Sequence, residues 1–225
     1  MGGGNVKINV VEEDLGPATK VLYCAKTHWG TNTRIIYCDD DRLPDRTWLK
    51  EFLKATGKNP DKAIVASGFD ISRYNLNPSP PRYPRAVKRR VIENPGYIGA
   101  RITQKVKELV FQRGFQKPSR INFKRSGFID IAAGYGGVSI KPEFFDIKAF
   151  RIPEALWTVD DIWLSGMLEL QSIGIWASNS IRVPICHNEK GDTVGLGGNL
   201  FEGNDRHSRN KIGIQYLQKT YKIWN

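Results

Sequence analysis

The sequence predicts a single α/β domain over residues 1–225, with a mixed, mostly parallel sheet flanked by helices. Three observations lead to this fold class. Short apolar segments alternate along the chain with segments whose apolar residues recur at helical spacing. Strands that alternate with helices are typical of parallel sheets, because each helix returns the chain to the same edge. The 225 residues are 40% hydrophobic and include six tryptophans, which suffices for one sizeable core.

The first elements show this alternation most clearly. We expect strands over residues 6–11, 35–39 and 62–67, and helices over residues 17–28 and 45–57. The second helix should bury one face carrying Trp48, Leu49, Phe52 and Leu53.

The middle of the chain, residues 75–125, is predicted to be a basic, proline-rich insertion. Four prolines between residues 78 and 84 exclude regular structure there. A helix is expected over about 102–112, with an apolar stripe at Val106, Leu109 and Val110. Between residues 82 and 125 only Glu93 and Glu108 oppose thirteen basic residues: Arg82, Arg85, Lys88, Arg89, Arg90, Arg101, Lys105, Lys107, Arg113, Lys117, Arg120, Lys124 and Arg125.

The last third of the chain should return to the sheet. Strands are expected over 127–131, 136–140 and 181–185, and helices over 158–173 and 206–221, with a glycine-rich loop at 188–204. Gly134, Gly136 and Gly137 suggest a tight turn or the close approach of a ligand to the backbone.

Composition places the protein in the cytoplasm. No apolar run approaches the roughly 20 residues that a membrane span needs, and the first residues lack a charged-then-apolar signal pattern. Cys24, Cys38 and Cys186 have no metal-binding spacing and are expected to be buried free thiols. The net charge of +11 points to an anionic partner, namely nucleic acid, an acidic membrane surface or a phosphorylated substrate; solubility alone is the alternative.

Three consecutive carboxylates, Asp39, Asp40 and Asp41, follow the strand expected at 35–39. Their mutual repulsion costs stability, so a positive group should lie beside them. Hard divalent cations take carboxylate oxygens, and ligands bind at the carboxyl ends of strands in parallel sheets. The cluster therefore predicts a site for a divalent metal, with or without a phosphate ligand. In the alternative, one carboxylate caps the next turn and the others are solvated.

Two further segments could carry chemistry. Asp160 and Asp161 lie in the first turn of a helix, where the dipole favours the ionised form that a general base needs. The turn from Gly16 to Lys20 opens a helix whose backbone amides and lysine could hold phosphate. Ordinary helix starts would explain both segments equally well. His187 and His207 are possible ligands or bases, although a lone histidine is more often structural.

Four motifs in order resemble those of GT-A-type nucleotide-sugar glycosyltransferases, and in particular the family-2-like bacterial enzymes. They are Glu-Asp-Leu-Gly-Pro-Ala-Thr-Lys at 13–20, Asp-Asp-Asp at 39–41, Gly-Tyr-Gly-Gly-Val at 134–138 and Val-Asp-Asp-Ile-Trp-Leu-Ser-Gly at 159–166. The resemblance covers residues 6–67 and 127–185. It implies a Rossmann-like GT-A fold and metal-dependent transfer, with inversion, from a nucleotide-diphosphate sugar to a glycan or a lipid-linked acceptor.

The resemblance also implies roles for individual residues. Asp39 and Asp41 match the family's DXD motif, so Asp41 would bind Mn²⁺ or Mg²⁺ and Asp39 the donor's ribose or the metal. Asp161, paired with Asp160, would be the catalytic base for the acceptor hydroxyl. The donor would be bound by Asp39, Asp40, Lys20, Gly16, Gly136 and Gly137.

The sequence departs from the family in two places. Family members begin with a further strand and helix that hold the nucleobase, and this chain starts after them, so the fold is expected to be N-terminally shortened. Residues 75–125 have no counterpart, and peripheral contact with an anionic membrane through residues 82–125 is one role for them. Two other hypotheses remain open: a nucleic-acid-binding or metal-dependent nuclease-like protein, and a non-catalytic protein of glycosyltransferase fold. Nucleic acid is the less favoured partner, because aromatic residues do not interleave regularly with the basic ones.

Overall fold

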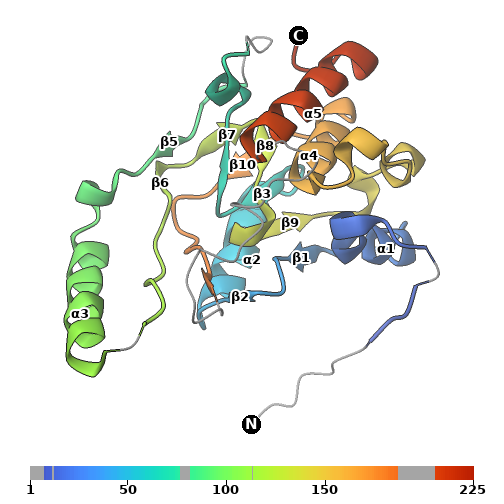
Figure 1. The fold of residues 1–225 in the computed structure, drawn as a ribbon. Coiled ribbons are helices and arrows are strands. Elements are labelled where there is room, and N and C mark those ends of the chain that lie inside the picture. The colour runs from blue at the N-terminus through green and yellow to red at the C-terminus, as the bar shows by residue number, and fades with distance from the viewer. Residues whose placement is uncertain (1–7, 12, 77–81, 113, 187–205) are drawn as a thin grey trace.

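The computed structural model describes residues 8–11, 13–76, 82–112, 114–186 and 206–225 and shows a mixed α/β fold (Figure 1). A five-stranded sheet in the order β1-β9-β3-β10-β7 forms its centre. Three two-stranded sheets, β11-β2, β4-β8 and β5-β6, surround it. The strands are β1 (Ile35–Tyr37), β2 (Arg42–Leu43), β3 (Ala63–Val65), β4 (Gly68–Phe69), β5 (Val87–Lys88), β6 (Phe123–Arg125), β7 (Gly127–Ile129), β8 (Ile131–Ala132), β9 (Val138–Ile140), β10 (Ile175–Ala177) and β11 (Ile185–Cys186).

The central sheet is mostly antiparallel, so the expectation of a mostly parallel sheet is wrong. Only β3 and β10 pair in parallel, while β9 runs antiparallel to both β1 and β3, and β7 antiparallel to β10. The reason lies in where β9 and β7 enter the sheet. Strand β9 lies between β1 and β3, and β7 lies at the edge beside β10; both run opposite to the other three strands. Alternation with helices, on which the prediction rested, holds only as far as β3.

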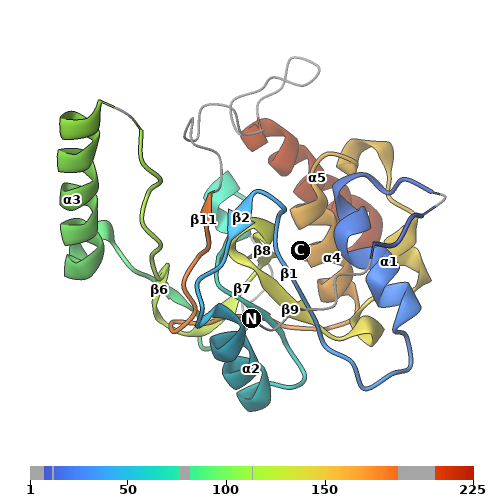
Figure 2. The same cartoon turned by 90° about the horizontal axis from the view of Figure 1, so that it is seen from below.

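Helices cover both faces of the sheet (Figure 2). The α-helices are α1 (Thr19–Thr27), α2 (Trp48–Lys58), α3 (Pro95–Phe111), α4 (Asp160–Leu170) and α5 (Arg206–Tyr221). Strand β3 shows the two layers, because Ala63 and Val65 belong to the core formed with α1, α4 and α5, whereas Ile64 packs with Trp48 and Phe52 of α2. The described part of the chain has no helix with the length and apolar run needed to cross a bilayer.

Several predicted elements differ from the structure. Residues 8–11 are not a strand: Ile8 and Val10 are exposed, and no neighbouring strand pairs with them in the described residues; residues 6–7 lie outside these. The expected strand at 181–185 is reduced to β11, while β10 fills the place in the central sheet. Of the four apolar residues expected to be buried on α2, Leu49 and Leu53 are exposed. The three cysteines are free as expected, but none is buried: Cys24 is exposed, and Cys38 and Cys186 are partly exposed.

The insertion forms an arm, defined here as residues 82–125. Strands β5 and β6 pair antiparallel at its base, and α3 lies at its far end, away from the rest of the molecule in both views (Figures 1 and 2). The helix starts at Pro95, a proline suited to the first turn, rather than at residue 102. The proline-rich residues 77–81 lie outside the described residues, as does the predicted glycine-rich loop at 188–204.

Candidate functional site

Lys20 lies between two carboxylates that come from different motifs. Its Nζ is 2.6 Å from Asp39 Oδ1 and 2.9 Å from Asp160 Oδ2. Lys20 is placed by α1, Asp39 by the end of β1, and Asp160 by the first turn of α4. Burial alone would lower the pKa of Lys20, but the negative charges of Asp160 and Asp39 raise it above its ordinary value. The ammonium is therefore permanently charged and ties the three elements together.

Asp161 is the carboxylate with the most altered titration. Burial, and next the charge of Asp160, raise the pKa of Asp161 to about 7, although Lys20 and a backbone hydrogen bond oppose the shift. The hydrogen bond comes from the Gly134 N–H to Asp161 Oδ1 at 2.9 Å. A carboxylate with a pKa near neutrality is suited to accept a proton from a substrate at physiological pH.

Gly134 marks the point where the motifs converge. A Cβ atom on this residue would lie 3.0 Å from Lys20 Nζ, and 3.1 Å from both Asp39 Oδ1 and Asp161 Oδ1. The turn Gly134–Gly136 precedes β9, whose first residue pairs with Tyr37 of β1. All four motifs thus meet at Gly134, and Asp160 also contacts Lys20. The expected close approach to this turn is made by charged side chains of the protein.

Asp40 and Asp41 occupy different surroundings from Asp39. Asp40 is exposed. Asp41 Oδ1 is 3.0 Å from Arg42 Nε, and its Oδ2 accepts a hydrogen bond from the Cys186 thiol at 3.5 Å. Asp41 Oδ1 is buried yet accepts no hydrogen bond among the described residues. The cation beside this oxygen in the structure is the Arg42 guanidinium, with which a metal would compete.

Asp39 and Asp41 are each paired with a cation of the protein, Lys20 and Arg42 respectively. Within the described ranges, no three His, Cys, Asp or Glu side chains gather into a complete ligand set. Mg²⁺ is commonly held by one or two carboxylates together with substrate phosphates and water, and Mn²⁺ suits the same oxygen ligands. Asp39 and Asp41 are each about one-third exposed, so both can be reached by such a complex.

The other predicted donor-binding residues have structural contacts of their own. The N–H of Gly16 donates to Asp14 Oδ1 at 2.8 Å, and a Cβ on Gly16 would lie 3.0 Å from the Trp157 ring. A Cβ on Gly136 would clash with Ser67, and one on Gly137 would lie 2.2 Å from the Trp48 ring. Close packing therefore accounts for these three glycines without a ligand.

A cavity of about 580 Å³ opens beside Asp161. Sequence reasoning did not identify it, because its walls come from six separate segments of the chain. Arg73 was not singled out at all, while Lys88, Arg89 and Arg120 appeared only as members of the basic cluster. The cavity is lined by residues that include Arg73, Lys88, Arg89, Arg120, Asp161 and Arg206.

Polar side chains form one wall of this cavity. Ser67 Oγ is 2.7 Å from the Tyr135 hydroxyl and accepts a hydrogen bond from Asn122 Nδ2 at 2.9 Å. The His207 ring lies 4.6 Å from the Tyr74 ring, also in the wall. His207 is thus near Asp161 but stacked, while His187 lies outside the described residues.

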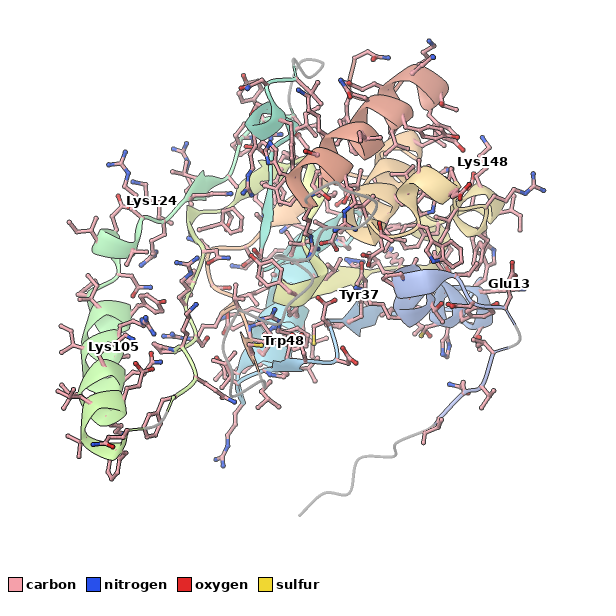
Figure 3. All side chains as sticks on the ribbon, viewed as in Figure 1. Glu13, Tyr37, Trp48, Lys105, Lys124 and Lys148 are labelled. Atoms are coloured by element: carbon pink, nitrogen blue, oxygen red, sulfur yellow. The ribbon has the colours of Figure 1, made fainter. Side chains whose placement is uncertain are left out.

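Tyr37 is a further residue that sequence reasoning missed. Burial, followed by the charges of Asp161, Asp160 and Asp39, raises the pKa of Tyr37 well above its ordinary value. Figure 3 labels Tyr37 in the body of the molecule. Its hydroxyl remains protonated and can donate a hydrogen bond to the site.

Comparison with family models, with curated proteins and with solved structures finds no match to this chain.

Proposed function

We propose that this protein is a metal-dependent glycosyltransferase of the GT-A type. It would move a sugar from a nucleotide-diphosphate donor to an acceptor hydroxyl on a glycan or a lipid-linked molecule, with inversion. The observation that carries the proposal is the convergence of Lys20, Asp39, Gly134 and the Asp160-Asp161 pair on one point. The convergence brings together four motifs that are far apart in the chain.

In this proposal Asp161 is the catalytic base. Its carboxylate takes the proton from the acceptor hydroxyl, the acceptor oxygen forms a bond to the anomeric carbon, and the bond from that carbon to the diphosphate breaks. The electron pair leaves with the diphosphate, so the products are the glycoside, a nucleoside diphosphate and a protonated Asp161. The hydrogen bond from the Gly134 N–H orients the carboxylate.

Lys20 and the metal carboxylates would serve the other end of the reaction. Lys20 holds Asp39 and Asp160 in place, because its Nζ contacts both. Asp39 and Asp41 would hold Mn²⁺ or Mg²⁺, which when bound acts as a Lewis acid that stabilises the departing diphosphate. Asp40, exposed on the same turn, would contribute only to the local negative charge.

The proposal is tested by assaying donor turnover with Mn²⁺ for wild type and for Asp161→Asn and Asp41→Asn. Loss of the base should reduce turnover by about 10²–10⁴-fold. The control is Asp61→Asn, which removes an equal charge from an exposed carboxylate that pairs with Lys62. If both site variants turn over sugar nucleotides as fast as wild type, the site assignment is wrong. Absence of turnover together with absence of nucleoside-diphosphate binding would favour the non-catalytic alternative.

A further inference from the structure

The cavity beside Asp161 carries an excess of positive charge that the protein does not neutralise. Arg73, Lys88, Arg89 and Arg120 line it, and none of the four forms a salt bridge within the described ranges. Arg206 also lines it, with its guanidinium 3.9 Å from Asp161 Oδ2. Asp161 is the one carboxylate among the described lining residues. Like charges gathered around one space raise its positive potential and attract an anion.

One cation in the cavity has an unused hydrogen-bond donor. Arg89 Nε is buried and makes no hydrogen bond in the described part of the chain. Partial burial, and next the charge of Arg73, lower the pKa of Lys88; the charge of Asp70 opposes the shift, and Arg120 adds to it. Arg73 lies over the Phe69 ring at 5.5 Å, which directs its guanidinium along the wall. An anion in the cavity would offset the repulsion among the cations and accept a hydrogen bond from the unused donor.

We propose that this cavity binds a phosphate or diphosphate group carried by the acceptor. The inference rests on the proposed function, since Asp161 and the cations line the same space: the hydroxyl to be glycosylated would lie at Asp161 and the phosphate at the cations. Guanidinium groups bind phosphate through paired hydrogen bonds, and several of them favour a multiply charged oxyanion. A soluble sugar phosphate and a lipid-linked sugar diphosphate share this chemistry.

The test measures binding of inorganic pyrophosphate by calorimetry at low salt, with EDTA present. The Lys88→Gln/Arg120→Gln double variant should bind at least about tenfold more weakly than wild type, because two charged hydrogen bonds are lost. Lys50→Gln, which removes an exposed charge from α2, should bind like wild type. The proposal is overturned if wild type does not bind, or if the double variant binds equally well.

A competition arm identifies the source of the phosphate. Glucose 1-phosphate and farnesyl diphosphate are each titrated against bound pyrophosphate. Displacement by either one supports the proposal and indicates a soluble or a lipid-linked acceptor, whereas displacement by neither contradicts it. Because metal and donor are absent, the binding result does not depend on catalysis. Sugar transfer without pyrophosphate binding would refute only this inference. Pyrophosphate binding without sugar transfer would refute only the proposed function.

A second, independent observation concerns the orientation of α3. Its buried residue is the polar Gln104, which contacts the returning chain at Phe115 and also donates to Glu108 Oε1 at 2.8 Å. The apolar residues at helical spacing are instead exposed: Ile102, Val106, Leu109 and Val110 are 61%, 55%, 81% and 66% accessible. The apolar stripe predicted from sequence therefore faces away from the protein, on an element that already projects from it.

The arm that carries this apolar stripe is also strongly basic. The arm contains thirteen basic and two acidic residues, so its net charge of +11 equals that of the whole chain. Figure 3 labels Lys105 on α3 and Lys124 on β6, both on the arm. An exposed apolar stripe flanked by lysine and arginine is the pattern of a helix that lies on an anionic bilayer. We infer that the outward face of α3 docks onto the surface of an anionic membrane.

Vesicle sedimentation tests this inference. Wild type should sediment with phosphatidylcholine vesicles that contain phosphatidylserine, and much less with phosphatidylcholine alone. Ile102→Ser/Leu109→Ser should lose most of the binding, whereas Leu49→Ser/Leu53→Ser, an exposed apolar pair on α2 that is 54% and 55% accessible, should keep it. Equal binding by the two variants would overturn the inference. The inference would also be overturned if wild type does not bind the vesicles but forms a dimer that dissociates in the Ile102→Ser/Leu109→Ser variant.

Discussion

Asp161 shows how burial can set both the chemistry and the stability of a site. Its pKa of about 7 means that the folded protein releases this proton at a higher pH than an unfolded chain does. A carboxylate in that condition is a better base than an ordinary aspartate and remains ionised enough to act at neutral pH. The same burial makes its ionised form costly for the fold.

Asp161→Asn should therefore inactivate the protein and stabilise it above neutrality. Between about pH 4 and pH 7 the folded state binds more protons than the unfolded state, so wild-type stability falls as pH rises through this window. Asparagine cannot ionise, and at pH 8 the variant should gain about 2–4 kcal/mol. Urea unfolding at pH 5 and pH 8 measures this; an equal difference between variant and wild type at both pH values would contradict it. Wild-type turnover should rise with pH and level off above about pH 7.

Lys20 should matter for stability as well as for activity. Lys20→Gln leaves Asp160, whose side chain is only 10% exposed, without its cation. Removing one partner from such a buried pair should cost about 3 kcal/mol. The Lys20→Gln/Asp160→Asn double variant should recover part of this loss, because no uncompensated charge remains. Thermal unfolding of the two single variants and the double variant gives the coupling, and additive losses would show that the pair does not interact.

At the scale of elements, the turn before β9 determines how the site is assembled. This turn lies between the carboxylates on one side and α2 on the other, because Gly134 contacts the charged cluster and Gly137 contacts Trp48. Gly137 also has a φ of +96°, a conformation that favours glycine. Helix α2 thus supports the position of the site from the opposite face of the sheet.

Gly137→Ala should destabilise the protein by about 3 kcal/mol, because the added methyl would lie 2.2 Å from the Trp48 ring and the backbone is left-handed. Gly57→Ala is the matched control. Nothing lies within 4 Å of a Cβ at that position in α2, and alanine in a helix should stabilise by about 0.5–1 kcal/mol. Chemical denaturation of both variants measures the contrast. Similar effects of the same sign would show that Trp48 does not constrain the turn.

At the scale of the whole molecule, a body that holds the charged site carries an arm that holds the chain's entire net charge. The cavity lies where the two meet, since Lys88, Arg89 and Arg120 of the arm and Asp161 of the body all line it. In the function proposed above, the body would perform the chemistry and the arm would select the acceptor. The prediction of a cytoplasmic location stays compatible with an arm that contacts a membrane surface.

A nucleoside diphosphate with Mn²⁺ should stabilise the whole fold. Saturation at a hundred times the dissociation constant adds about 2.7 kcal/mol, which for a domain of this size raises the melting temperature by about 5–10 °C. EDTA, or the Asp39→Asn/Asp41→Asn double variant, should remove the shift for uridine and guanosine diphosphates alike. A shift that persists in EDTA would mean that the diphosphate binds without metal, for example in the basic cavity.

Local features of this protein, namely most of its helices and two strands of the central sheet, could be predicted from the sequence alone. The helices α1, α2, α4 and α5, the strands β1 and β3, and the charge of the arm follow from spacing, composition and helix-start residues, which act over a few positions. Sequence also singled out the motifs that contain Lys20, Asp39 and Asp161. Three features became visible only in the tertiary structure. The sheet is mostly antiparallel, Lys20 joins Asp39 to Asp160, and the apolar stripe of α3 faces outward. These features depend on which segments pair and pack across long stretches of chain, and periodicity within one segment contains no information about its partner.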